Sequence, residues 1–134
     1  MTNSNPTVWL AFQATDAPAL IDYYVNTFGF VEAVRHGEGD VVHHAQLNWP
    51  EGSGGIMLGS HRPDAEWCRE PGTAGGYVVT TDPDALFERV VQRGADIVRP
   101  LAKTDYGARE FAVRDPEGNL WSFGDYTGES VPSD

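Results

Sequence analysis

The sequence contains a single cysteine, Cys68, and few basic residues: nine lysines and arginines stand against twenty aspartates and glutamates, for a net charge of −11. One cysteine excludes a disulfide framework within the chain and fits a reducing compartment, so we expect a cytoplasmic protein. The acidic balance argues against nucleic acid or an anionic membrane as a partner, because both bind basic surfaces. No apolar run approaches the roughly 18 residues that a transmembrane helix needs, and the polar N-terminus does not resemble a secretory signal.

The sequence also lacks a glycine-rich phosphate-binding loop and a CxxC pair. These absences remove the usual sequence signals of nucleotide binding and of a dithiol centre. What is present fits one globular domain, because the chain has 134 residues of which 40% are hydrophobic and 11% aromatic.

Two stretches of the chain share one order of elements, which predicts an α+β fold made of two βαβββ modules. Each predicted helix begins after an aspartate, Asp16 or Asp82, with a proline in its first turn, and each ends at a glycine, Gly29 or Gly94. The predicted strands cover residues 8–13, 30–35, 41–49, 56–59, 76–81, 95–99, 106–114 and 119–125. We therefore expect a single domain, 1–134, with module one at about 7–60, a connector at 61–74, module two at about 75–126 and a loose tail at 127–134.

The last two strands are predicted to form a hairpin around the turn Asp115-Pro-Glu-Gly118. A four-residue loop would pair Arg114 with Asn119, which places Glu110 on one face of the hairpin. The opposite face, which we expect to line a binding site, would carry Arg109, Phe111, Val113, Leu120 and Ser122.

Three stretches resemble the vicinal oxygen chelate superfamily, which includes glyoxalase I, extradiol dioxygenases, fosfomycin-resistance enzymes and bleomycin-resistance proteins. They are Asp16–Phe30, Asp82–Ala95 and Asp115–Trp121, and the resemblance spans roughly residues 7–126. The resemblance implies that the two modules form a curved mixed sheet and that the site lies on its concave side, which we call the cup. It also implies a homodimer, which is common in this superfamily. It leaves the function open, since this fold hosts many reactions and some pure binders.

The metalloenzymes of this superfamily carry their ligands, typically two histidines and a glutamate, on the first and last strands of each module. At the matching positions this sequence has Trp9, Gly75 and Ser122, with Met57 or Leu58 in the fourth strand. A catalytic metal needs about three protein ligands, so we expect no metal of the family type and no other cofactor.

Displaced ligands would have to come from His43, His44 or Glu110. Neighbouring residues of a strand point to opposite faces, so the two histidines are not expected to share one ion. We also expect no histidine close enough to activate Cys68 as a nucleophile.

The residues expected to bind a ligand are Trp9, Ala11, Gln13, His44, Met57, Arg109, Phe111 and Ser122. Two interpretations stay open for several of them. Trp9 can stack on a ligand or fill the cup as core, and Arg109 can bind a carboxylate or pair with one of the acidic residues.

The resemblance favours a metal-free, dimeric small-molecule binder similar to the bleomycin-resistance branch, where drugs are sequestered in aromatic-lined clefts. An acidic chain with aromatic residues in the cup suits a cationic or aromatic compound such as an antibiotic. One alternative is an enzyme of the superfamily: a metal-dependent lyase, isomerase or dioxygenase with displaced ligands, or a metal-free acid–base enzyme that uses His44 or Glu110. Another alternative is a regulatory module that acts through its dimer surface. A cup filled by side chains would favour this alternative.

Overall fold

The computed structural model describes residues 5–132; residues 1–4, and residues 133–134 of the predicted loose tail, lie outside the described residues. The elements are, in order, β1 (Leu10–Ala14), α1 (Ala17–Tyr23), the π-helical turn η1 (Tyr24–Phe28), β2 (Val31–Glu38), β3 (Val41–Asn48), β4 (Gly55–Ser60), β5 (Gly75–Val79), α2 (Pro83–Gln92), β6 (Asp96–Lys103), β7 (Arg109–Arg114) and β8 (Leu120–Gly124). This order confirms the predicted α+β class with two βαβββ modules.

Both long helices begin as the sequence predicts. The Asp16 carboxylate accepts the Ala19 N–H at 3.2 Å, and the Asp82 carboxylate accepts the Ala85 N–H at 3.0 Å. Each cap satisfies one of the unpaired N–H groups of a helical first turn. The first helix passes into η1 and ends at Gly29, whose φ of 96° suits a residue without a side chain.

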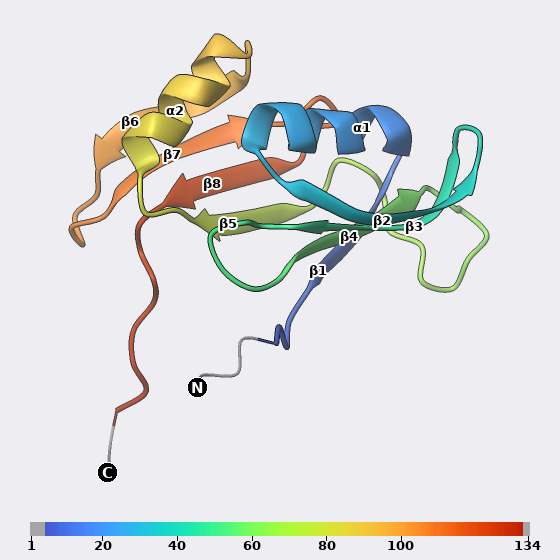
Figure 1. Ribbon diagram of the computed structural model, residues 1–134, viewed down its shortest axis with the longest axis horizontal. Coiled ribbons are helices and arrows are strands. Elements are labelled where there is room, and N and C mark those ends of the chain that lie inside the picture. Colours follow the sequence, from blue (N-terminus) through green and yellow to red (C-terminus); the bar gives the residue numbers. More distant parts are fainter. Residues whose placement is uncertain (1–4, 133–134) are drawn as a thin grey trace.

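Each module forms a four-stranded sheet, with strand order β1-β4-β3-β2 in the first and β5-β8-β7-β6 in the second. Within each sheet the first and last strands of the module are parallel, and the other pairs are antiparallel. In Figure 1, α1 and α2 lie on the same side of the two sheets, with α2 over β6 and β7. Among the described residues, no helix covers the opposite face of either sheet.

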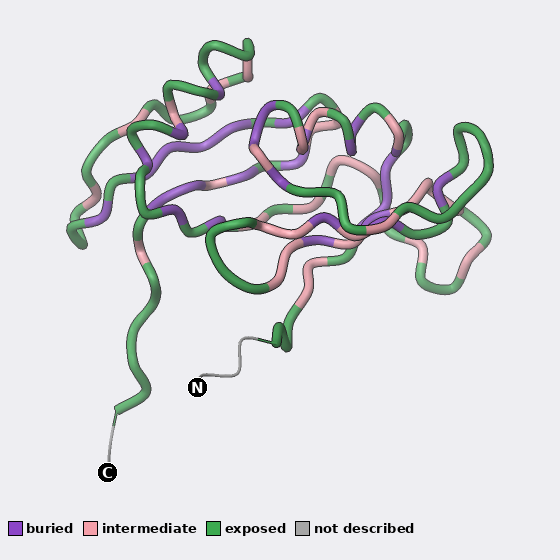
Figure 2. The backbone as a smooth tube through the Cα atoms, in the orientation of Figure 1, coloured by how far each residue is buried: buried purple, intermediate pink, exposed green. Residues whose placement is uncertain are grey.

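One aromatic core fills the space between the helices and the sheets, and it joins the two modules (Figure 2). Its largest fully buried aromatic side chains are Trp121, Tyr24, Phe28, Phe111 and Phe123. The Trp121 ring lies 5.3 Å from that of Tyr24 and 6.0 Å from that of Phe12, so the last strand of module two packs on module one. Such aromatic pairs add stabilisation beyond the area that they bury.

The predicted register of the closing hairpin is wrong by one residue. The loop has five residues, Asp115–Asn119, so Arg114 pairs with Leu120 and Ala112 pairs with Ser122. Since strand side chains alternate with a period of two, this shift moves Phe111 into the core and places Glu110 on the same face as Ser122.

The extra loop residue is explained by the Asp115 side chain, which is only 3% exposed. One of its oxygens accepts the backbone N–H groups of Glu117 and Asn119, at 2.9 and 3.0 Å. The other accepts the Tyr24 hydroxyl, the Asn119 amide and the Trp121 indole N–H, at 2.6, 2.9 and 3.0 Å. Asp115 therefore closes the loop and at the same time connects it to the first helix.

Two glutamates hold the modules together in a symmetric way. Glu51 accepts the backbone N–H of Thr81 at 2.8 Å, and Glu117 accepts that of Thr15 at 2.7 Å. Each glutamate lies in a Pro-Glu-Gly turn between the last two strands of its own module and reaches the strand–helix junction of the other. The spacing in the chain between the two glutamates equals the spacing between the two aspartates that cap the helices, so these turns belong to the internal repeat.

Among residues 5–132, no helix is long and apolar enough to cross a membrane. The longest, α2, has ten residues.

Candidate functional site

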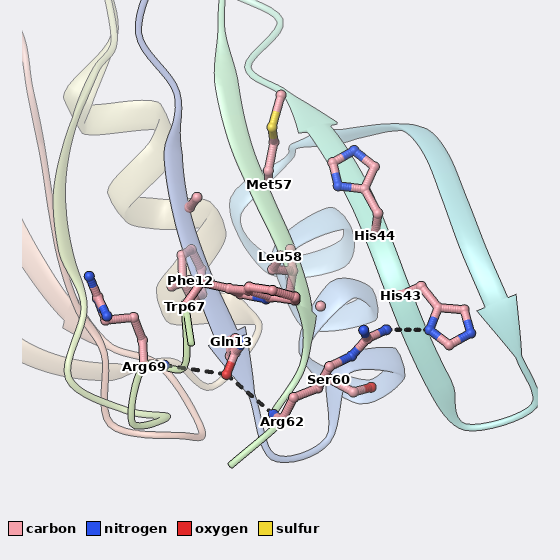
Figure 3. Close-up of a pocket in the computed structure, with 12 residues that line it drawn as sticks. Phe12, Gln13, His43, His44, Met57, Leu58, Ser60, Arg62, Trp67 and Arg69 are labelled. Atoms are coloured by element: carbon pink, nitrogen blue, oxygen red, sulfur yellow. Dashed lines mark hydrogen bonds between the residues drawn. The ribbon is translucent and has the colours of Figure 1, made fainter. Parts of the chain in front are cut away.

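A cavity of about 390 Å³ opens on the helix-free face of the first sheet, and we call it the first-sheet cavity. It is lined by Ala11, Phe12, Gln13, His43, His44, Met57, Leu58, Gly59, Ser60, Arg62, Trp67 and Arg69 (Figure 3). Strands β1, β3 and β4 supply its floor, and the connector between the modules supplies Arg62, Trp67 and Arg69. Its volume falls in the range of small-molecule sites.

A β-bulge in β3 places two histidines in this cavity. Strand β2 pairs His36 with His44 but Gly37 with Val42, so His43 is an extra residue in β3. The prediction that His43 and His44 point to opposite faces is wrong, because a bulge breaks the alternation of a strand. Both are exposed, and both line the first-sheet cavity.

The connector is held against the sheet by Gln13, a nearly buried residue of β1. Its side-chain oxygen accepts the backbone N–H groups of Arg62 and Arg69, at 3.3 and 3.4 Å. These two bonds fix both ends of the segment that carries Trp67, whose ring lies across the cavity in Figure 3. Trp67 is 64% exposed, so its ring is available to a ligand.

The polar lining of the cavity is basic, although the chain as a whole is acidic. The guanidinium of Arg62 donates to Nδ1 of His43, which leaves the proton of a neutral His43 ring on Nε2. Arg69 donates to the backbone carbonyl of Cys68 at 2.9 Å and has no ion pair among the described residues. Among residues 5–132, no aspartate or glutamate lines the cavity. The site can therefore offer positive charge and N–H donors to an anionic or acceptor group.

Four of the eight predicted ligand-binding residues come together in the first-sheet cavity: Ala11, Gln13, His44 and Met57. The other four lie elsewhere. Trp9 is half-buried ahead of β1 and does not line the cavity. Phe111 is a fully buried core residue, because the hairpin register differs from the predicted one. Ser122 lies on the second sheet.

Arg109 also lies away from the cavity, where its guanidinium binds the Asp84 carboxylate at 2.8 and 3.2 Å. Of the two interpretations given for this residue, the ion pair with an acidic group is the one found in the structure. Arg62 and Trp67 were not among the predicted site residues, because the polar composition of the connector does not show which of its side chains would reach the first sheet.

Glu110 has the same orientation as Ser122 on the open face of the second sheet, but its oxygens are occupied. The carboxylate is nearly buried and accepts the hydroxyls of Tyr77 and Tyr106, each at 2.7 Å. Burial of the Tyr77 hydroxyl and this hydrogen bond both raise the pKa of Tyr77. A carboxylate held in this way is poorly placed to act as a general base or as a displaced metal ligand.

The lining of the first-sheet cavity contains His43 and His44 and, among residues 5–132, no carboxylate, while Glu110 lies on the second sheet. The expected absence of a metal of the family type stays a prediction. Within the described part of the chain, three metal-ligating side chains gather only in the connector, at His61, Cys68 and Glu70. The expectation that no histidine lies near Cys68 is also wrong, since Nε2 of His61 is 3.3 Å from its sulfur.

The structure has paired βαβββ modules and a cavity on the helix-free face of the first sheet, which is the arrangement that the sequence resemblance implied. A model of the Glyoxalase/Bleomycin resistance protein/Dioxygenase superfamily matches residues 7–123. The chain belongs to this superfamily.

Relatives and solved structures agree with this assignment. An uncharacterized protein of Mycobacterium bovis is 35% identical over 121 residues, covering 81% of this chain and 76% of that protein. TioX from Micromonospora sp. ML1 is 31% identical with a TM-score of 0.73, covering 89% of this chain and 98% of that one. TnmS3, an antibiotic binding protein from Streptomyces sp. CB03234, has a TM-score of 0.72 and 23% identity, covering 90% and 96%, which shows a shared fold.

Proposed function

We propose that this protein binds and sequesters an aromatic small molecule that carries an anionic or hydrogen-bond-accepting group. The observation that carries the proposal is the lining of the first-sheet cavity, where Trp67 lies beside Arg62 and Arg69 and no carboxylate is present among the described residues. A flat apolar ring offers a stacking surface, and two guanidinium groups offer charge and N–H donors. The structural neighbour TnmS3 is an antibiotic binding protein, which supports small-molecule binding as the role.

Of the two ligand types expected from the sequence, the lining of the cavity supports an aromatic ligand better than a cationic one. Net charge describes the whole surface, whereas a ligand contacts only the cavity, and there the charged side chains are basic. The presence of a cavity also argues against the purely regulatory module, which a filled cup would have favoured. We keep the cytoplasm as the proposed compartment, because the sequence contains a single cysteine and so carries no disulfide framework.

The proposal is tested with two fluorescent probes of matched aromatic size. 1-Anilinonaphthalene-8-sulfonate carries a sulfonate, and N-phenyl-1-naphthylamine does not. We expect the sulfonate to bind at least about tenfold more tightly, because a charge-assisted hydrogen bond contributes roughly 1.5–3 kcal/mol. Titrations monitored by probe fluorescence and by calorimetry give the two dissociation constants.

Matched variants locate the binding to the cavity. Arg62→Gln and Arg69→Gln should each weaken sulfonate binding about tenfold, and Trp67→Ala should weaken both probes. Arg114→Gln, which removes the same charge from an exposed ion pair with Asp96, should leave both affinities unchanged. Equal affinities for the two probes, or an equal loss in Arg114→Gln, would contradict the proposal.

The enzyme alternative makes a different prediction for compounds that bind. If the protein only sequesters, mass spectrometry after prolonged incubation recovers the compound unchanged. If His43 or His44 acts as an acid or base, the compound is converted and the conversion is lost in His43→Ala or in His44→Ala, respectively. Turnover would show that the superfamily's chemistry operates here without its usual ligands.

The proposed assembly is a homodimer in which the second sheet of one copy covers the first-sheet cavity of the other. The open face of the second sheet exposes apolar side chains, with Tyr77 at 40%, Val79 at 39% and Leu120 at 47% exposed. A face of this kind on an ordered sheet is typical of an interaction surface.

Sedimentation velocity tests this assembly. The protein is expected to sediment as a dimer, and Leu120→Asp is expected to shift it to monomer, since a charge in the apolar centre of an interface typically costs about 2 kcal/mol or more. Val91→Asp is the matched control, because Val91 is 48% exposed on α2, away from the sheet faces. A monomeric protein, or a dimer that Leu120→Asp leaves intact, would refute the assembly.

A further inference from the structure

We propose that His61, Cys68 and Glu70 form a binding site for a zinc-like divalent metal ion in the connector between the modules. Their ligand atoms all lie within 4.8 Å of one another, and the Cys68 sulfur is 3.3 Å from Nε2 of His61. Around a tetrahedral zinc ion, with bonds of about 2.3 Å to sulfur and about 2.0–2.1 Å to nitrogen, these two atoms would be about 3.6 Å apart. The existing geometry thus needs only a small adjustment to hold an ion.

The backbone on both sides of the loop is already fixed. The His61 N–H donates to the Ala14 carbonyl at 2.9 Å, which continues the pairing of β1 with β4. Gln13 binds the N–H groups of Arg62 and Arg69, which directly follow two of the three ligands in the chain. The ligands come from positions 61, 68 and 70, so the loop must close on itself to bring them together, and these hydrogen bonds hold it closed. A preorganised site spends less binding free energy on ordering the chain.

The backbone of Glu70, the third ligand, is held by the Thr73 hydroxyl, which donates to the Glu70 carbonyl at 2.7 Å. The backbone of Cys68 is held as well, because its N–H donates to the Ala65 carbonyl at 3.1 Å. The Glu70 carboxylate has no hydrogen bond or ion pair within residues 5–132, so it is available as a ligand. Its exposed position lets the side chain turn toward the sulfur and the imidazole.

The donor set indicates the class of ion. A thiolate, an imidazole and a carboxylate together suit zinc, whereas magnesium and calcium prefer oxygen donors alone. Three protein ligands leave one tetrahedral position for water. This site lies in the connector, away from the strand positions at which the superfamily carries its metal ligands. The proposal therefore differs from the expectation of no metal, but the metal centre that it describes is not the one of the superfamily.

Cobalt titration of the reduced full-length protein tests the site, because a thiolate bound to Co²⁺ gives a sulfur-to-metal charge-transfer band in the near ultraviolet. We expect the band to saturate at about one ion per chain and to disappear when Zn²⁺ displaces the cobalt. Cys68→Ser should abolish the band. His61→Ala and Glu70→Gln should each weaken Co²⁺ binding about tenfold or more.

Glu66→Gln is the matched control, because Glu66 is an exposed acid of the same connector outside the cluster. It should leave Co²⁺ binding unchanged. A measurement on the unaltered protein covers the case in which a variant fails to fold: one equivalent of Zn²⁺ should slow the alkylation of Cys68 by iodoacetamide at least about tenfold.

The proposal is overturned if no charge-transfer band forms, if the band persists in Cys68→Ser, or if Zn²⁺ leaves the alkylation rate unchanged. If Glu66→Gln and Glu70→Gln weaken Co²⁺ binding equally, the ion is attracted by the acidic surface as a whole and is not bound at a specific site. None of these results depends on the first-sheet cavity, so the proposed ligand-binding function is tested separately.

Discussion

Replacing Asp115 with alanine is expected to destabilise the protein by about 3–5 kcal/mol, among the largest effects of a single substitution. The side chain is 3% exposed and accepts five hydrogen bonds, from the Tyr24 hydroxyl, the Trp121 indole, the Asn119 side chain and two backbone N–H groups. Alanine would leave these donors without an acceptor in the protein interior. A buried donor without a partner costs roughly 1–3 kcal/mol, and water entering the loop recovers part of the total.

Urea unfolding followed by circular dichroism measures this change in the free energy of unfolding. Asp115→Asn should also be strongly destabilising, because a neutral amide has one acceptor oxygen and adds two donors of its own. Tyr24→Phe, which removes one of the five donors, should cost about 1–2 kcal/mol. Asp105→Ala is the control at an exposed aspartate and should change stability by less than about 0.5 kcal/mol. A loss below 1 kcal/mol in Asp115→Ala would show that this network does not hold the modules together.

Raising the pH from 10 to 12 is expected to lower the stability of the fold by about 2–3 kcal/mol. Burial, followed by the negative charges of Asp115 and Asp96, raises the pKa of Tyr23 to about 12. Burial and the adjacent Asp115 carboxylate also raise the pKa of Tyr24. In the unfolded chain both tyrosines ionise near pH 10.

The sign follows from proton linkage. Between pH 10 and 12 the unfolded state has lost the tyrosine protons that the folded state keeps, so the free energy of unfolding falls as the pH rises. The stabilisation is complete below pH 10 and is lost progressively as the pH rises toward the folded pKa. Over two pH units, one fully buried tyrosine can lower the free energy of unfolding by at most about 2.7 kcal/mol. The contribution of the half-exposed Tyr23 is clearly smaller, because solvent screens its interaction with the neighbouring carboxylates.

Urea unfolding at pH 9, 10, 11 and 12 tests this dependence. Tyr24→Phe removes the more buried phenol, so its stability should fall less steeply over the same range, although its stability at pH 9 is lower. Tyr126→Phe removes an exposed phenol at the chain end, whose pKa is also raised, by desolvation and by Glu129; because solvent screens this group, its slope should change much less than that of Tyr24→Phe. A wild-type stability that is flat between pH 10 and 12 would contradict the prediction.

The lining of the first-sheet cavity was predicted only where strand alternation held. Ala11 and Gln13 follow the alternation of β1, and Met57 follows that of β4, so these side chains face the first-sheet cavity as expected. Phe111 was misplaced because one additional loop residue reverses the face of every residue in a paired strand. His43 was misplaced for a related reason, since a bulge changes the alternation at a single position.

The connector shows a different limit of sequence reasoning. Its prolines and polar residues indicate a loop, but the position of a loop depends on a contact made far away in the chain. Here that contact is the Gln13 side chain, which binds Arg62 and Arg69 and so brings Trp67 over the cavity. The same closure places His61 beside Cys68.

The sequence by itself determined the two βαβββ modules, because aspartate caps, terminal glycines and apolar periodicity act within a few residues of each other. It also determined the superfamily, through the turn at Asp115 and the repeat of the helices. Only the tertiary structure decided the hairpin register, the shared face of His43 and His44 and the charge of the cavity. These features depend on contacts such as Asp115 with Tyr24, whose partners are far apart in the chain and meet only when both modules have folded.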